Sequence, residues 1–434
     1  MTPFIVGLIG FAVLIILFMA DVPIAFAMAL VGMGGFMYLV SFNSGMNLPV
    51  RDIFSQFTSY PLTVIPMFVL MGSYAFAAGI GRKLFGTAYT IMGRTRGGMA
   101  IASVLACTGF GAVCGSTSAT CATIGKVAIP EMRRFKYSDV LSTGTVAAAG
   151  GLGIMIPPST TFVVYGILTE QSIGKLFISG IIPGILIAVM FIFTVIIYCQ
   201  RNPTAGPPGP ATTWKQKFVS LTGLIDTLVL FALAIGGLFA GLFSPTQAGA
   251  IGSVGALIIG IARREMTWKS FVESSRDGLR ISCMIMMLVA GAVVFGHFIA
   301  VTGIATTLAD WARGLSVAPW VIMALLYVLW FILGCLVDAM ALIVILVPIF
   351  YPLVIELGYD PIWFGVMITL FSMVAVITPP VGVNVYVVKG LFKEIKLETV
   401  FKGIFPYLIP YTLAAAMIIA FPQIATFLPR FISY

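Results

Sequence analysis

The stretch Gly153-Ile154-Met155-Ile156-Pro157-Pro158-Ser159-Thr160-Thr161 places two prolines inside an apolar segment, and Val376-Ile377-Thr378-Pro379-Pro380-Val381-Gly382-Val383-Asn384 does so again 222 residues later. Proline removes a backbone donor and clashes with the preceding helical turn, so two in succession end a helix. Inside a bilayer the released N–H and carbonyl groups find no partner in lipid, and they must face protein, water or an ion. Two such breaks in corresponding halves indicate the midplane binding site of a secondary transporter.

The composition is that of a membrane protein. The 434 residues are 60% hydrophobic and only 9% charged, with a mean hydropathy of +1.10. Apolar stretches of about 20 residues, the length that crosses a bilayer core, recur along the chain. The net charge of +9 comes from basic residues in short loops, which is typical of membrane topology signals rather than of nucleic-acid binding.

Cysteine and histidine usage predicts neither disulfides nor a transition-metal site. The six cysteines lie in or beside apolar segments, where small buried thiols are expected. The single histidine, His297, has no cysteine or histidine at ligand spacing and no acid near it in sequence, so it is interpreted as a packed side chain. The first residues lack the basic region of a cleaved signal peptide, so Pro3–Ala20 is expected to be a retained span.

Further short matches recur at nearly the same offset as the Pro-Pro pairs. Pro23 and Pro245 each open an apolar segment, Ala77–Ile80 resembles Val301–Ile304, and Gly180–Pro183 resembles Gly403–Pro406. Four matches in the same order predict two homologous halves, residues 1–200 and 218–434. A proline-rich cytoplasmic linker, residues 201–217, joins them.

The distribution of Lys and Arg predicts how the halves are oriented. With the N-terminus outside, full spans are expected at 4–20, 23–40, 61–80, 140–170 (broken), 176–199, 219–242, 246–261, 281–303, 362–388 (broken) and 404–421. Of the 24 basic residues, only Arg51, Lys175, Arg313 and Arg430 then lie outside, as the positive-inside rule requires. Five spans in each half is an odd number, which inverts the second half and leaves both chain ends in the periplasm.

Two further apolar segments, 99–130 and 319–352, are too short for two crossings of about 20 residues each. The first has a centre rich in small and hydroxylated residues, and the second contains Asp338. We therefore expect re-entrant helical hairpins, one entering from the cytoplasm and one from outside. The alternative for each is a pair of short, tilted spans. Segments 80–96 and 304–315 mix charged with apolar residues and are expected to be interfacial helices.

Asp338 is the one acid that this topology places well inside the membrane, where a carboxylate normally serves an ion or proton pathway. Hydroxyl, amide and main-chain oxygens near the hairpin tips and breaks suit a monovalent cation. The expected ion-binding residues are Ser116, Ser118, Gly153, Pro157, Asp338, Thr378, Pro379 and Gly382. Near helix N-termini, whose dipoles favour a substrate carboxylate, the expected substrate-binding residues are Thr117, Thr120, Ser159, Thr160 and Asn384. The alternative is that these small residues only let helices approach closely.

With these motifs the chain resembles the large membrane subunit of tripartite ATP-independent periplasmic (TRAP) transporters, within the ion transporter superfamily. The resemblance covers nearly the whole chain and is most specific at Gly115–Thr120, Ile156–Ser159, Ser244–Ala250, Asp338 and Thr378–Gly382. It implies an elevator-type, sodium-coupled importer of organic acids, such as sialic acids or C4-dicarboxylates, in the bacterial inner membrane.

The resemblance also implies two protein partners. One is a small four-helix membrane subunit, expected to be a separate chain because no extra N-terminal helical domain is present here. The other is a periplasmic binding protein that delivers the substrate. The family does not fix the substrate, and no intramembrane arginine stands out as a carboxylate clamp.

Two rival functions follow from the residues. One is a self-sufficient, ion-coupled carrier of anions or dicarboxylates that needs no binding protein. The other is an intramembrane enzyme, which usually requires several acids or histidines at the membrane face, whereas the spans offer only Asp338 and His297. No phosphate-binding loop, nucleophile elbow or zinc motif is present, which favours transport over catalysis and over an ATP-driven mechanism within this chain.

Overall fold

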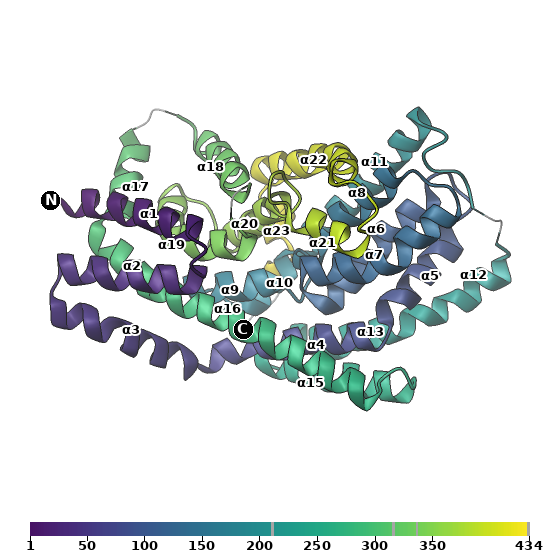
Figure 1. Ribbon diagram of the computed structural model, residues 1–434, viewed down its shortest axis with the longest axis horizontal. Coiled ribbons are helices and arrows are strands. Elements are labelled where there is room, and N and C mark those ends of the chain that lie inside the picture. The colour runs from purple at the N-terminus through teal and green to yellow at the C-terminus, as the bar shows by residue number, and fades with distance from the viewer. Residues whose placement is uncertain (210–211, 315–316, 336, 432–434) are drawn as a thin grey trace.

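The computed structural model describes residues 1–209, 212–314, 317–335 and 337–431, and every regular element in these ranges is a helix (Figure 1). The predicted all-helical class is confirmed. The helices of the first half are α1 (Pro3–Met19), α2 (Ile24–Leu39), α3 (Phe42–Phe57), η1 (Tyr60–Thr63), α4 (Val64–Ala77), α5 (Ile80–Met92), α6 (Gly98–Cys114), α7 (Thr117–Arg134), α8 (Asp139–Gly150), η2 (Gly151–Ile154), α9 (Thr160–Thr169), α10 (Ile173–Ser179) and α11 (Ile181–Arg201).

The second half opens with a composite helix that changes between α, 3-10 and π geometry. The composite helix consists of α12 (Trp214–Ser220), η3 (Leu221–Leu224), α13 (Ile225–Phe231), η4 (Ala232–Gly236) and α14 (Gly237–Phe239). The helices that follow it are α15 (Pro245–Ala262), α16 (Trp268–Thr302), α17 (Ile304–Gly314), α18 (Pro319–Gly334), α19 (Ala339–Glu356), α20 (Pro361–Ala375), α21 (Val383–Leu391), α22 (Leu397–Ala420), α23 (Gln423–Thr426) and η5 (Leu428–Phe431).

Seven helical stretches in the described residues are long and apolar enough to cross a membrane, by length and composition. They are Tyr60–Ala77, Ile173–Arg201, Trp214–Phe239, Pro245–Ala262, Trp268–Thr302, Ala339–Glu356 and Leu397–Ala420. The chain is therefore a multi-pass membrane protein. Helices α1 and α2 have 17 and 16 residues, and the two broken spans are each divided into shorter helices, so the full count of ten spans stays a prediction.

Helix boundaries recur along the chain at similar offsets. Helices α7 and α19 begin 222 residues apart, at Thr117 and Ala339, and so do α8 and α20, at Asp139 and Pro361. Gly79 and Gly303 precede α5 and α17, and both adopt left-handed conformations with φ of 69° and 67°, which glycine tolerates without a Cβ clash. The inverted orientation of the halves and their assignment as separate repeats stay predictions.

Local sequence explains where several helices begin. Ser244 forms a capping box at the start of α15: its hydroxyl accepts from the Gln247 N–H at 3.3 Å, while the Gln247 side chain accepts from the Ser244 N–H at 2.9 Å. Pro245 occupies the first helical position, where its missing N–H has no cost. This is the Ser-Pro-Thr-Gln motif of the second half.

Two helices lie where the sequence predicted loops. Residues 42–57 form α3, capped by Ser41, whose hydroxyl accepts from the Ser44 N–H at 3.2 Å. Helix α16 has 35 residues and starts at Trp268 rather than 281, because Thr267 caps it and accepts from the Ser270 N–H. At about 1.5 Å per residue, α16 is about 52 Å long, so it extends well beyond a bilayer core.

The helices pack into two groups that cross the sequence halves. In the scaffold group, α16 lies along α2, α3 and α4, and α15 packs on α4 and on the composite helix α12–α14 (Figure 1). In the core group, α6–α11 pack with α18–α22.

Two contacts hold parts of the core group together. Helices α8 and α22 meet through glycines: a Cβ on Gly144 would lie within 2.2 Å of the Gly403 carbonyl carbon. Arg133 on α7 also bridges Asp139 of α8 at 2.7 Å and Glu394 after α21 at 2.5 Å.

Candidate functional site

The first hairpin, α6–α7, places its tip directly on the first Pro-Pro break. Gly115 closes α6 in a left-handed conformation, and Ser116 caps α7. The Gly115 carbonyl accepts from both the N–H and the hydroxyl of Thr160, at 3.3 and 2.9 Å. The backbone just before the break also lies against this tip. A Cβ on Gly153 would lie 2.6 Å from the Ser116 carbonyl oxygen and 2.5 Å from Thr120 Oγ1.

The second hairpin, α18–α19, carries Asp338 at its tip and approaches the second break. Asp338 caps α19, and its Oδ2 accepts from the Met340 N–H at 2.9 Å. Gly334 packs against α20, where a Cβ would lie 2.9 Å from the Ala375 Cα, just before the break. In the break itself, Thr378 Oγ1 donates to the Val374 carbonyl at 2.6 Å, and Gly382 has a φ of 43°.

Both hairpin tips open onto one cavity of about 290 Å³, which we call the tip cavity. It lies between the core group and α4 and α16 of the scaffold group. Its polar lining consists of hydroxyl groups and two carboxylates: Ser73, Ser116, Thr117, Ser118, Thr160, Thr161, Ser274, Asp277 and Asp338. None of its described lining residues is Lys, Arg or His. An oxygen-rich, acidic surface of this kind suits a hard cation.

The structure brings together some of the predicted site residues and separates others. Ser116, Thr117, Ser118, Thr160 and Asp338 line the tip cavity. Thr120 and Gly153 lie behind the first tip. Ser159 caps α9, where its hydroxyl accepts from the Phe162 N–H. The remaining predicted residues, Pro157, Thr378, Pro379, Gly382 and Asn384, belong to the breaks and do not line this cavity.

Asn384 and Thr120 are buried polar side chains, each with an oxygen that accepts no hydrogen bond from the described residues. The Asn384 amide donates to the Ala147 carbonyl at 2.9 Å, but its Oδ1 has no hydrogen-bond partner among the described residues. Thr120 Oγ1 is also buried without a hydrogen-bond partner there, with the weakly polar Cys114 thiol beside it. Buried polar atoms are normally satisfied, so these two oxygens are candidates for contact with a bound ion or ligand.

Sequence reasoning missed Asp277. Because Arg276 and Arg280 flank it, the segment was interpreted as a cytoplasmic loop, whereas the structure places it on α16 and in the tip cavity. The signal was present in the spacing: Ser274, Asp277, Ile281 and Ile285 follow one another at three or four residues and so share a helix face.

Other buried acids also escaped the sequence analysis. Asp226 on α13 is 5% exposed and pairs with Lys83 and Arg263 at 2.8 Å each. Asp52 on α3 is also 5% exposed and shares a 2.7 Å hydrogen bond with His297 Nδ1. The interpretation of His297 as a packed side chain is therefore wrong, since its side chain is half exposed and paired with an acid.

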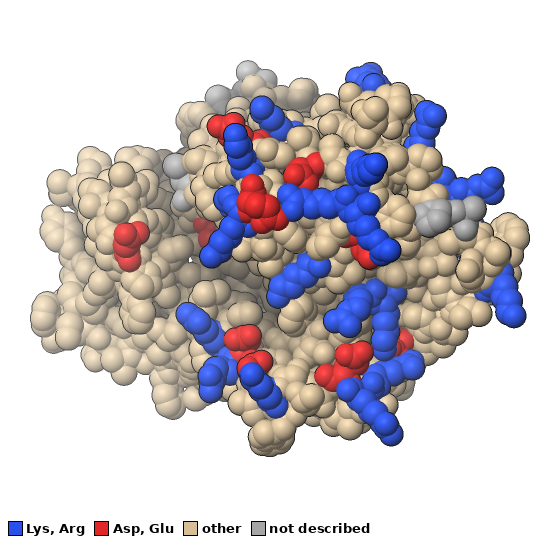
Figure 2. Space-filling view, turned by 45° about the vertical axis from the view of Figure 1, so that its right-hand side comes forward, with Lys and Arg blue, Asp and Glu red and all other residues tan. Residues whose placement is uncertain are grey.

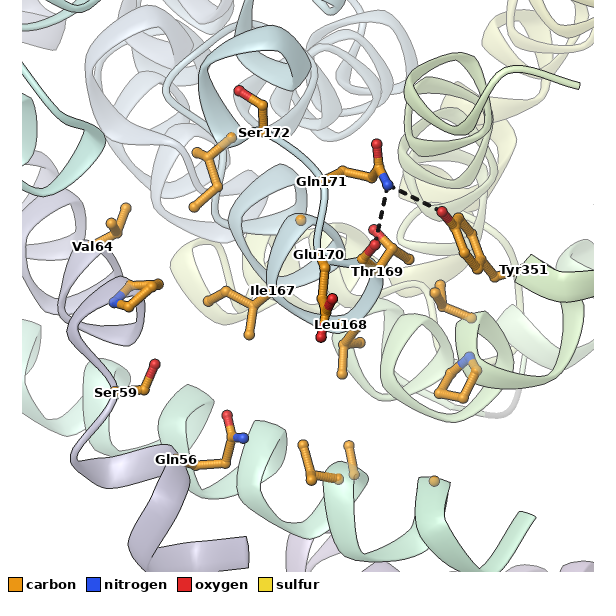
Figure 3. Close-up of a pocket in the computed structure, with 18 of the residues that line it drawn as sticks. Gln56, Ser59, Val64, Ile167, Leu168, Thr169, Glu170, Gln171, Ser172 and Tyr351 are labelled. Atoms are coloured by element: carbon orange, nitrogen blue, oxygen red, sulfur yellow. Dashed lines mark hydrogen bonds between the residues drawn. The ribbon is translucent and has the colours of Figure 1, made fainter. Parts of the chain in front are cut away.

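A second cavity of about 960 Å³ lies between the α3–α4 junction and the turn that joins α9 to α10 (Figure 3). Gln56 and Ser59 come from one side, and Glu170 and Gln171 from the other. The Gln171 amide donates to Tyr351 on α19 at 3.1 Å and to the Thr169 carbonyl at 3.2 Å. His297 also lines this cavity.

The same four helices line both cavities, at opposite ends. On α16, Ser274–Ile285 contribute to the tip cavity and Ala292–His297 to the second cavity. Helices α4, α9 and α19 are divided between the cavities in the same way. On α16, Ala292 lies seven positions after Ile285, which is about 10 Å at 1.5 Å per residue. The two cavities therefore lie at opposite ends of the same four helices.

Charge is unevenly distributed on the molecular surface. On the face that Figure 2 brings forward, Lys and Arg are numerous, whereas the left part of the same view is nearly free of charge. Cytoplasmic faces of membrane proteins carry an excess of these residues. The apolar helices and this charge asymmetry are those of a polytopic membrane protein, and the two cavities at opposite ends of the same helices are consistent with a transporter.

Comparison with known proteins identifies its family. The chain belongs to the DctM component family of tripartite ATP-independent periplasmic transporters, whose family model matches residues 11–424. It is 33% identical to the C4-dicarboxylate TRAP transporter large permease DctM of Pseudomonas aeruginosa, over 92% of this chain and 94% of that protein. It is 31% identical to the sialic acid TRAP transporter large permease SiaM of Vibrio cholerae, over 96% and 97%. The predicted family and the non-enzymatic function are confirmed.

Two further similarities bear on fold and organisation. The YdaH transporter of Alcanivorax borkumensis has a solved structure that aligns with a TM-score of 0.57 over 86% of this chain and 89% of that chain, at 17% identity. That similarity concerns the fold alone. The isethionate TRAP transporter permease DctMQ of Oleidesulfovibrio alaskensis is 33% identical, and the match spans only 63% of its length.

Proposed function

We propose that this chain is the large membrane subunit of a sodium-coupled, binding-protein-dependent importer of an organic acid that works by an elevator mechanism in the bacterial inner membrane. The observation that carries the proposal is the meeting of both hairpin tips at one cavity, with a second cavity at the opposite end of the same helices. A carboxylate such as a C4-dicarboxylate or a sialic acid is the proposed substrate class, because relatives named for both are 33% and 31% identical to the chain.

The two packing groups provide the parts of an elevator. The core group carries both tips and both breaks, so it would move as one body with the bound ion and substrate. The scaffold group contributes α4 and α16 as a fixed wall. The interface between them is close at Gly72, where a Cβ would lie 2.7 Å from the Cys114 carbonyl oxygen at the first tip.

Two groups of oxygens are proposed to bind sodium. One lies at the first tip, where the Ser116 carbonyl and Thr120 Oγ1 both face Gly153. The other lies at the second tip, where Asp338 supplies a carboxylate next to the break that contains Thr378 and Gly382. The first group is uncharged and the second contributes one carboxylate, and this small total charge favours a monovalent over a divalent cation.

Thr120→Val provides a test of the first group. Valine has the shape of threonine without its hydroxyl, so removal of an unsatisfied buried oxygen should leave the melting temperature in potassium unchanged or higher. If Thr120 Oγ1 binds sodium, the half-saturating sodium concentration should rise about fivefold, about 1 kcal/mol of lost contact. Sodium-dependent melting of the purified protein measures both effects. An unchanged sodium titration would remove Thr120 from the ion site.

The dependence on partners is tested by reconstitution. The chain is placed in proteoliposomes with and without a small four-helix membrane subunit and a periplasmic binding protein, and uptake of labelled succinate and N-acetylneuraminate is measured in a sodium gradient. We expect uptake only with all three components. Uptake by this chain alone, unchanged by either partner, would favour the self-sufficient carrier. Uptake driven equally well by a proton gradient without sodium would exclude sodium coupling.

The outer face, on which the predicted topology places Arg313, is where a periplasmic binding protein would dock, and it contains an ion pair that was not visible in the sequence. Arg313 on α17 bonds Glu356 at the end of α19 at 2.8 Å and Asp310 at 3.1 Å. We expect Arg313→Glu to reduce uptake several-fold at low binding-protein concentration, with partial rescue at high concentration, because charge complementarity mainly sets the association rate.

The double variant Arg313→Glu/Glu356→Arg separates docking from internal pairing. It restores the internal ion pair but reverses both surface charges. If Arg313 contacts the binding protein, the double variant stays impaired. If the loss in the single variant comes from the broken pair between α17 and α19, the double variant regains uptake, and the docking assignment is wrong.

A further inference from the structure

We propose that Asp277, on the scaffold wall of the tip cavity, sets the cation dependence of the site by adding a second negative charge to a cavity that must also hold an organic anion. This inference rests on the proposed sodium-coupled transport and assigns a specificity-determining residue to it. Asp277 belongs to α16, whereas Asp338 belongs to the second hairpin tip, so the two carboxylates come from different packing groups.

The placement of Asp277 is specific. Its side chain is exposed and lies on the helix face that presents Ser274 and Ile281 to the cavity. Its carboxylate forms no salt bridge within the part of the chain that the structure describes, although Glu273, one turn earlier on the same helix, is within 4.0 Å of Lys269. Arg276 and Arg280 flank Asp277 in sequence but do not line the cavity.

The electrostatic consequence follows from the lining. With two carboxylates and no cationic side chain among its described lining residues, the cavity attracts a cation and repels an organic anion. The substrate therefore binds favourably only after a cation has neutralised part of this charge. Behind the first tip, the buried Thr120 Oγ1 and the Ser116 carbonyl, which both face Gly153, are the oxygens proposed above to hold such a cation.

Movement of the core group would also separate the Asp277 carboxylate from the Asp338 carboxylate. If the core group slides along α4 and α16, Asp338 travels with the ion and substrate while Asp277 stays behind. The second charge would then act only in the state described here, where it raises cation affinity and weakens retention of the anion. Asp277 would in this way make release of the anion follow loss of the cation.

The test is a sodium titration that needs no substrate. Melting of the purified chain is followed as sodium chloride replaces potassium chloride at constant ionic strength. We expect Asp277→Asn to raise the half-saturating sodium concentration about three- to tenfold, the effect of removing one nearby charge at partial solvent screening. Asp277→Glu, which keeps the charge, should stay within about twofold of the wild type.

Glu273→Gln is the matched control, because it removes one carboxylate from the same helix but outside the cavity. It should leave the sodium titration unchanged. If Asp277→Asn matches Glu273→Gln while the wild type shows sodium-specific stabilisation, the role of Asp277 is wrong and sodium binding stands. If the wild type itself shows no preference for sodium over potassium, both the sodium coupling and this inference fail.

Discussion

Asp338→Asn is expected to reduce sodium-driven uptake more than the loss of any other polar side chain in the site. The carboxylate caps α19 through the Met340 N–H and opens onto the tip cavity. Asparagine caps helices about as well as aspartate, so the hairpin should keep its structure while the cavity loses a charged ligand. Loss of an interaction with a charged group costs about 2–3 kcal/mol, which corresponds to roughly a 30- to 150-fold higher half-saturating sodium concentration.

The chain offers a matched control at Asp360. This residue caps α20 in the same manner, accepting from the Ile362 and Trp363 N–H groups at 2.7 and 3.0 Å, but it lies outside the tip cavity. Asp360→Asn should leave the sodium dependence of uptake unchanged. Equal losses in the two variants, with parallel falls in melting temperature, would show that Asp338 acts as a helix cap and not as an ion ligand.

The features predicted best from the sequence are those that arise from local backbone chemistry. The broken spans were predicted at 140–170 and 362–388, and the structure places α8–α9 and α20–α21 there, because consecutive prolines end a helix wherever they occur. Ser116 and Asp338 were expected at hairpin tips because each lies near the middle of an apolar segment too short for two crossings, and the structure places each at the start of the second hairpin helix. Each is an oxygen-bearing residue preferred at a helix N-terminus, at the centre of an apolar stretch.

The features that were missed depend on packing between distant residues. Arg133 and Glu394 pair across 261 positions, and nothing in a single sequence links them. Asp277 was assigned to a loop because charged neighbours obscured the helical spacing of the face it shares with Ile281. The helix at 42–57 is not predicted by its polar local sequence, because the surface on which it packs is supplied by a distant helix, α16.

Gly72→Leu is expected to abolish most uptake, because it places a side chain between the two groups that the elevator requires to slide. Gly72 lies on α4, and a Cβ there would lie 2.7 Å from the Cys114 carbonyl oxygen and 3.1 Å from the Cys114 Cα. Backbone atoms at that distance cannot move aside locally. The core group must therefore leave this position, and we expect uptake to fall at least tenfold in the proteoliposome assay.

Gly34→Leu is the control, since a Cβ at Gly34 on α2 meets nothing within 4 Å. The melting temperature distinguishes a movable interface from a static one. If the core group moves as a body, the variant escapes the clash by populating another state, so uptake is lost while the melting temperature changes little. If the contact between α4 and the first tip is a fixed part of the fold, overpacking costs about 1–3 kcal/mol, and the loss of uptake is accompanied by a lower melting temperature. That second outcome would contradict the elevator mechanism, because the tip would then be anchored to the scaffold that it has to leave.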